Sequence, residues 1–128
     1  MASRSRDKAK VREQNKDRRP HAIAKYIRIS PSKVHVVLDL IRGHDYAEAV
    51  AILKTTPKAA CEPVLKCLNS AAANAEVNLG MNKDALYVAE CFADQGPNLK
   101  RMQPVSRGRG YRILKRTSHI TVILDERA

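Results

Sequence analysis

The spacing of apolar residues first predicts one strand and three helices. Residues 21–29 alternate apolar and polar side chains, as half-buried strands do. From Pro31 onward, apolar residues recur every three or four positions, which is the spacing of one face of a helix. Three such stretches follow one another. The first is expected to end at Gly43, the third to open at Pro57, and the third to close at Gly80.

Two further stretches predict strands. Residues 86–93 and 111–124 are apolar and rich in β-branched or aromatic side chains, and we expect them to pair. In the first of them, Leu86, Val88 and Phe92 should share one face. The predicted fold class is therefore α+β: a two-layer β-α-α-α-β-β domain in which a small antiparallel sheet packs on three helices.

The segment between these two strands is too long for an ordinary turn. From Val88 to a tip near Val105 the chain extends for seventeen residues, or about 55 Å at ~3.3 Å per residue. A domain of ~100 residues has a radius of gyration of only about 13 Å. We therefore expect a hairpin arm, about 94–116, to project from a globular domain at 20–125. Since a two-stranded ribbon is marginal in water, such an arm should become ordered against a partner.

Positive charge is concentrated in two segments. The formal net charge is +11, and residues 1–19 hold eight Lys or Arg against three acids. Between Asp94 and Asp125 there are seven Lys or Arg and no carboxylate. This asymmetry favours a polyanionic partner for the arm, and nucleic acid is the obvious one. Residues 1–19 have no apolar periodicity and predict a disordered basic extension, at most transiently helical, for which RNA contact and a solvated tail both stay open.

The candidate RNA-binding residues of the arm are its cations and the polar residues beside them. Two guanidinium groups flank Gly108, where little side-chain bulk hinders approach to phosphates, and Arg can also stack on bases. Alternation places Thr117 and His119 in one row with Lys115. For His119, a structural role is the alternative to RNA contact. The set is Lys100, Arg101, Arg107, Arg109, Arg112, Lys115, Arg116, Thr117 and His119.

Other chemistries find little support. Cys61, Cys67 and Cys91 are odd in number and form no C-x-x-C, so reduced cytosolic thiols are expected rather than disulfides or a metal site. The arm offers no carboxylate as a base, and no nucleophile or phosphate-loop motif occurs, so we expect neither catalysis nor a cofactor. No apolar run approaches the ~20 residues of a membrane span, and the first residues lack the apolar region of a signal peptide.

Several motifs together resemble the bacterial-type large-subunit ribosomal protein L-twenty-two family. Residues 24–34 and 39–43 resemble its opening, residues 70–76 its third helix, and residues 96–122 its long hairpin. The resemblance implies a structural constituent of the large ribosomal subunit that binds rRNA, supports assembly and lines the polypeptide exit tunnel. It also implies a cytoplasmic monomer within the ribosome that meets neighbouring ribosomal proteins and the nascent peptide, but no membrane. On the globular part, it implies RNA contacts by Lys25, Arg28, Ser32 and Lys33.

The resemblance further implies that the tip of the hairpin lies in the tunnel wall. The family often carries Arg directly after the tip proline, whereas this chain has Val105 and then Ser106. The charge of the tip is therefore expected to shift toward Arg107. The tip region of the family influences macrolide antibiotics, and residues 100–102 fall on that segment. The expected tip residues are Met102, Pro104, Val105, Ser106, Arg107 and Gly108.

Two other functions compete with rRNA binding. A β-ribbon with prolines near its tip is typical of architectural proteins that kink the minor groove of DNA. Such proteins are usually two-fold dimers, and the predicted helices show no obvious dimer seam. The third possibility is an interaction module that grips an acidic protein. Competition between duplex DNA and structured RNA distinguishes DNA binding from rRNA binding. Sedimentation with large subunits through a high-salt wash distinguishes a structural ribosomal component from an interaction module.

Overall fold

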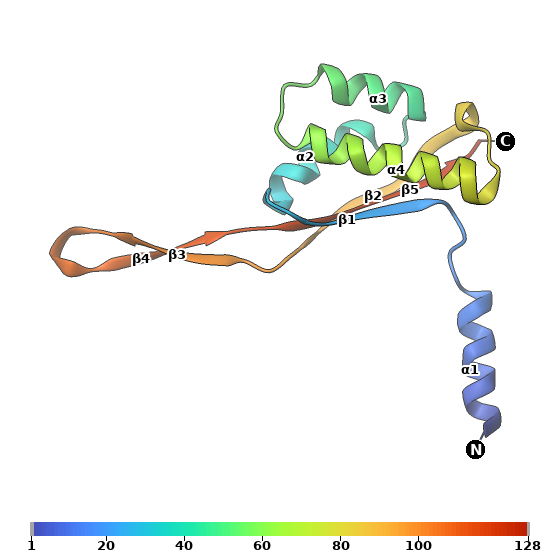
Figure 1. Cartoon of the computed structure of the whole chain (residues 1–128), viewed down its shortest axis with the longest axis horizontal. Helices are drawn as coiled ribbons and strands as arrows, with labels where there is room; N and C mark the ends of the chain where they lie inside the picture. Colours follow the sequence, from blue (N-terminus) through green and yellow to red (C-terminus); the bar gives the residue numbers. More distant parts are fainter. Residues whose placement is uncertain (1, 128) are drawn as a thin grey trace.

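The computed structural model describes residues 2–127 and confirms the α+β fold (Figure 1). A three-stranded antiparallel sheet has the order β1-β5-β2, with β1 at His21–Ile27, β5 at Ser118–Glu126 and β2 at Leu86–Gln95. Three helices, α2 (Pro31–Ile41), α3 (Tyr46–Thr55) and α4 (Cys61–Leu79), lie on one face of this sheet. A short 3₁₀ turn, Lys83–Ala85, leads into β2.

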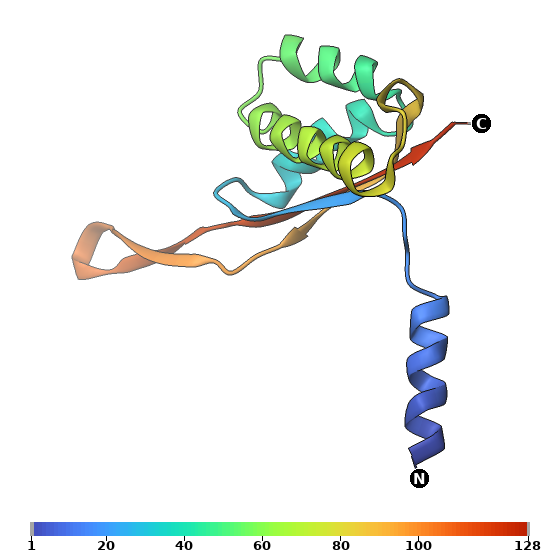
Figure 2. The same ribbon diagram turned by 45° about the vertical axis from the view of Figure 1, so that its right-hand side comes forward.

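The arm is a separate two-stranded ribbon. Strands β3 (Leu99–Pro104) and β4 (Gly110–Lys115) pair only with each other in the sheet topology, and the 3₁₀ turn Ser106–Gly108 joins them. Figures 1 and 2 show the ribbon extending far beyond the globular domain, on the side away from the chain's C-terminus. The break at 96–98 between β2 and β3 separates the ribbon from the sheet, so the arm is not one continuous extension of it.

The core lies between the sheet and the helices. Helix α2 starts with Pro31 in its first turn and buries four large residues at the predicted spacing. Helix α4 lies across β1 and β5, where the buried small side chains of Ala71, Ala72 and Ala75 allow close approach. The sequence predicts that this helix begins at Pro57, but it begins at Cys61. Residues 57–60 instead form a turn, which is closed by the bond from the Cys61 N–H to the Lys58 carbonyl.

A bulge in β2 corrects the predicted position of Phe92. The pairing with β5 shifts between Val88 and Glu90, which inserts one extra residue and exchanges the two faces of the strand. Leu86 and Val88 are buried before the bulge, and Cys91 is buried after it, whereas Phe92 is 37% exposed on the open face. Alternation therefore holds within each half of the strand, and the prediction that all three named residues share one face is wrong.

Both outer strands of the sheet are irregular at their free edges. Pairing of β1 with β5 shifts between Ala24 and Ile27, and Tyr26 within this step has a φ of 57°, which non-glycine residues rarely adopt. On the other edge, Val88 of β2 is bonded to the segment after α2: Gly43 donates to its carbonyl at 3.0 Å, and its N–H donates to the His44 carbonyl at 2.9 Å.

The basic extension is helical where the sequence analysis expected disorder. Helix α1 (Ala2–Gln14) has no glycine or proline, and its side chains from 3 to 14 are all exposed. An isolated helix shorter than about 12–15 residues is marginal in water, so α1 rests on local propensity and not on tertiary packing. Figure 2 shows it standing apart from the sheet and helices. Arg19 supplies the tie to the domain by pairing with Glu90 at 2.8 Å.

Candidate nucleic-acid interface

The arm carries cations on both of its faces. Residues that pair across an antiparallel ribbon point to the same side, and neighbours along a strand point to opposite sides. One face therefore holds Arg101 and Lys115, together with Leu99, Ile113 and Tyr111; the other holds Lys100 and Arg112, together with Met102 and Leu114. Met102 and Tyr111 are each 67% exposed. Neither face is packed on the protein, so both mix positive charge with open apolar surface.

The tip is a tight loop with strained backbone. The N–H of Val105 donates to the carbonyl of Arg109 at 2.9 Å and closes the loop. Within it, Arg107 has a φ of 62° and Gly108 a φ of 69°. The left-handed conformation costs a non-glycine residue roughly 1–2 kcal/mol, and the Arg107 side chain is exposed. The loop thus presents a guanidinium group at the far end of the arm.

The base of the arm, residues 96–98 and 115–117, is internally bonded. The N–H of Gly96 donates to the Thr117 carbonyl at 2.9 Å, and the Thr117 hydroxyl donates to the Pro97 carbonyl at 2.6 Å. Thr117 is only 4% exposed. Its hydroxyl is used inside the protein to join the two segments that lead into the ribbon, and the RNA contact predicted for Thr117 stays a prediction.

His119 also has an internal role. Its Nδ1 accepts a hydrogen bond from the N–H of Tyr26 at 3.0 Å, which fixes the tautomer with the proton on Nε2. The two rings meet edge to face with centroids 4.9 Å apart. This contact supports the left-handed backbone of Tyr26 at the bulge in β1. The side chain is half-buried, so the structural role that competed for His119 in the sequence analysis is the one the contacts describe.

Arg28 connects the globular domain to the base of the arm. Its guanidinium group donates to the backbone carbonyls of Lys115 and Arg116 at 3.4 and 3.3 Å. Because these bonds occupy one side of an exposed guanidinium, the remaining donors stay open to solvent. The other predicted contacts on the domain are also exposed: Lys25, Ser32 and Lys33.

The side chains that the structure brings together form one basic surface. Arg28, Lys33, Lys115 and Arg116 line a shared hollow where the first turn of α2 meets the arm. The remaining arm cations, Lys100, Arg101, Arg107, Arg109 and Arg112, continue this surface to the tip and are all exposed. Sequence reasoning missed Lys58, which lies in the turn before α4 and faces the same region, because nothing local marks it as close to α2.

Metal and thiol chemistry do not contribute to this surface. Within residues 2–127, no group of three or more His, Cys, Asp or Glu is arranged to hold a metal ion. The three cysteines are free and buried, and burial raises the pKa of the Cys67 and Cys91 thiols. No helix in the same range is long and apolar enough to cross a membrane.

Comparison with known proteins identifies the family. A sequence model of the family described as ribosomal protein L22p/L17e matches residues 22–125, which cover the globular domain and the arm. The chain belongs to this family. Among similar proteins, the large ribosomal subunit protein uL22 of Clostridium novyi is 59% identical over 107 residues, covering 84% of this chain and 96% of that protein. The uL22 proteins of Clostridium beijerinckii and Acetivibrio thermocellus are each 60% identical over 107 residues, with 96% and 86% of their lengths covered.

The L22p/L17e match begins just after the basic extension ends. Residues 1–21 lie outside the matched range, so α1 is an addition to the part of the chain that the family shares. The bonded base of the arm lies inside that range. Gly96 lies in this base, and sequence reasoning assigned it no contact. A β-carbon at Gly96 would stand 2.5 Å from the Thr117 Oγ1, a closeness that only the folded contact reveals.

Proposed function

We propose that this protein is a structural constituent of the large ribosomal subunit that binds rRNA through its arm and the adjoining globular surface. As a member of the L22p/L17e family it is a structural ribosomal protein and not an enzyme, and it works in the ribosome in the cytoplasm. The observation that carries the proposal of direct rRNA binding is the arm. Both of its faces expose cations and apolar groups, and it has no acid to balance them.

The shape of the arm favours a partner that surrounds it. One flat contact would bury the apolar groups of only one face of the ribbon, whereas folded RNA can cover both faces. The seven cations spread along the ribbon and its base suit phosphates on either side. We infer that the globular domain stays outside and that the ribbon is inserted between RNA segments, supporting assembly of the subunit.

The tip is proposed to form part of the polypeptide exit tunnel. Met102, Pro104, Val105, Ser106, Arg107 and Gly108 are at the far end of the arm, where the left-handed turn exposes the Arg107 guanidinium. A backbone held in a costly conformation at an exposed tip is typical of a functional contact. Here Arg107 would meet rRNA or the passing nascent peptide, in a protein that is a monomer within the ribosome beside other ribosomal proteins.

The basic extension is proposed to add a peripheral RNA contact. Helix α1 buries no apolar face against the domain, and its cations are exposed all around. Like other basic segments that order on RNA, it can be helical by propensity and be held in place by phosphates. It therefore raises affinity without taking part in the fold.

Binding to protein-free large-subunit rRNA at several salt concentrations tests the proposal. If about six cations meet phosphates, log affinity should fall with log salt at a slope near −4 to −5. Charge removal at Lys100, Arg101 and Arg112 should reduce the slope by about 2, whereas removal at Lys54 and Lys83, on the helical side, should leave it unchanged. Affinity that does not respond to salt would contradict the proposal.

Competition with duplex DNA distinguishes the architectural alternative. The described part of the chain shows a single arm and an open sheet face, and no pair of arms. We expect structured RNA to displace the protein from duplex DNA at equal nucleotide concentration. A clear preference for duplex would support the DNA-binding alternative instead.

A further inference from the structure

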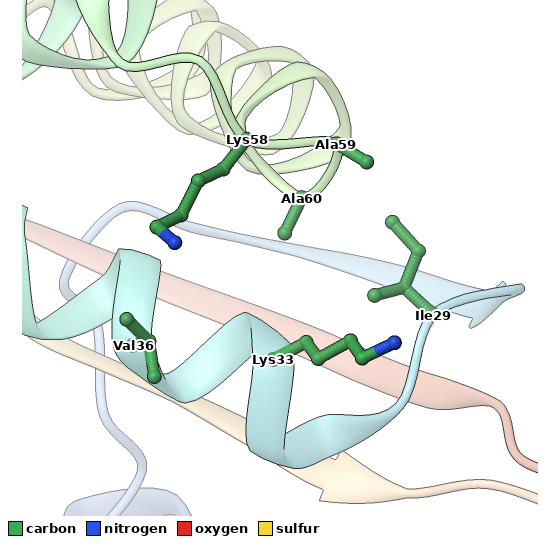
Figure 3. A pocket seen from close by; sticks show the side chains of 6 residues that line it. All are labelled: Ile29, Lys33, Val36, Lys58, Ala59 and Ala60. Atoms are coloured by element: carbon green, nitrogen blue, oxygen red, sulfur yellow. The ribbon is translucent and has the colours of Figure 1, made fainter.

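A hollow of about 310 Å³ opens between the start of α2 and the turn before α4 (Figure 3). Ile29, Val36, Ala59 and Ala60 supply apolar side chains to its walls. Lys33 reaches in from α2 and Lys58 from the turn above it, as Figure 3 shows. Lysines in such positions lay their methylene stems along apolar surface and keep the ammonium groups in water. The hollow therefore combines an apolar floor with a rim of two positive charges.

The hollow is continuous with the basic surface at the base of the arm. A neighbouring hollow of about 350 Å³ shares Ile29, Lys33 and Ala59 with it and extends to Lys115 and Arg116. No carboxylate lines either hollow, and Glu62, which lines the next one, is paired with Lys66 at 3.1 Å. A ligand that binds here is therefore expected to carry negative charge and to continue along the basic surface toward the arm.

We propose that this hollow binds one unpaired nucleotide of the RNA that the arm binds. Lys33 and Lys58 hold the phosphates on either side of that nucleotide, and the apolar floor receives its ribose and the face of its base. This inference rests on the proposed rRNA binding and assigns the hollow to one kind of RNA element. Paired bases are shielded by their own helix, whereas bases in loops and bulges can leave the stack and enter a pocket.

The lining side chains also set the specificity of the site. None of the six carries a carboxylate, amide or hydroxyl group, and the two lysine ammonium groups, which could read a base edge, are assigned to the phosphates. No aromatic ring lines it, so stacking does not favour one base over another. The hollow therefore selects an unstacked nucleotide by shape and charge and accepts any of the four bases.

Two variants test the site in different ways. Ala59→Phe fills the hollow, and since Ala59 is exposed, the larger side chain does not enter the core. Lys33→Ala with Lys58→Ala removes the two rim charges and leaves the floor intact. Lys54→Ala with Lys83→Ala is the matched control, because it removes the same charge from the helical side. Thermal unfolding of each variant confirms that the fold is kept.

The measurement is chemical footprinting of protein-free large-subunit rRNA with dimethyl sulfate and a 2′-hydroxyl acylating reagent. The wild-type protein should protect an unpaired nucleotide that both hollow variants expose again, while the protections made by the arm persist. Removing two phosphate contacts should also reduce the salt slope by about 1.4, at ~0.7 per contact on single strands. The control should keep the wild-type footprint and slope.

Footprints of the two hollow variants identical to the wild type would overturn the inference while leaving rRNA binding in place. Binding of the hollow by an acidic protein segment would give this same result. If the wild-type protein protected no nucleotide of the rRNA at all, the proposed function would be overturned instead, so the two failures are distinguishable.

Discussion

The hydroxyl of Thr117 donates a hydrogen bond to the carbonyl of Pro97, and the two oxygens are 2.6 Å apart. Because Thr117 is buried, this bond joins the two strands of the chain at the point where the arm leaves the sheet. We predict that Thr117→Val lowers the free energy of unfolding by about 1–3 kcal/mol, since the carbonyl loses its partner in a site with little access to water. Urea denaturation followed by circular dichroism measures the change.

Thr121→Val is the control for this bond. Thr121 lies in β5, four residues further along the chain, and is 7% exposed, but it pairs with Ile23 and Phe92 in the middle of the sheet and not with the base of the arm. Hydrogen exchange of the Gly96 amide, which donates to the Thr117 carbonyl, should speed up in the Thr117 variant only. Equal exchange in both variants would show that the bond does not hold the base together.

Gly96 and Thr117 are also coupled through space. A β-carbon at Gly96 would lie 2.5 Å from the Thr117 Oγ1 and 3.3 Å from the His119 ring. Gly96→Ala should therefore destabilise the domain by about 1–3 kcal/mol through overpacking. Adding Thr117→Ala, which removes the clashing oxygen, should make the double variant more stable than the sum of the single changes predicts. Gly108→Ala, with open space around it at the tip, should combine with Thr117→Ala additively.

The arm should be dispensable for folding. Among the described residues, no buried hydrophobic residue lies between Ala93 and Ile120. Replacing residues 99–115 by a short Gly-Ser linker should therefore leave a cooperative thermal transition close to that of the full chain. The same variant should lose most of the salt-dependent affinity for rRNA. A non-cooperative transition would show that the ribbon is part of the cooperative fold.

The stability of the domain should fall at alkaline pH because of its cysteines. Burial raises the pKa of the Cys67 and Cys91 thiols above their ordinary value of 9.0, so the folded protein holds protons that the unfolded chain releases. Their contribution is complete below pH 9 and is lost as the pH rises through the folded pKa. Urea denaturation from pH 7 to 10.5 should show the decline, and Cys67→Ala with Cys91→Ala should reduce it. An unchanged decline in that variant would assign it to other groups.

Much of the fold follows from local patterns, and the exceptions have physical causes. The helix beginning at Pro31 and the one ending at Gly80 are marked by residues that act through their own backbone, so the sequence alone predicts them. The bulge near Val88 is not predictable in this way, because an extra residue in a strand leaves no local sign. Phe92 was therefore assigned to the wrong face.

The candidate site divides along the same line. The exposure of its arm cations could be predicted because an acid-free run of charge has no core role. The internal use of Thr117 could not, since it depends on Pro97, twenty residues away along the chain. The composition of residues 1–19 predicts only that they lack a packed core. It does not exclude helix α1, because a helix needs only hydrogen bonds within itself.

The irregular edges of the sheet affect how readily newly made chains aggregate before they bind their partner. A free sheet edge is a template for pairing with another chain, and a protein made for assembly is exposed to copies of itself during synthesis. Here the segment at Gly43 and His44 covers one edge at Val88, and the turn of Tyr26 interrupts the other. The same features that shape the domain therefore limit strand-to-strand aggregation of newly made chains.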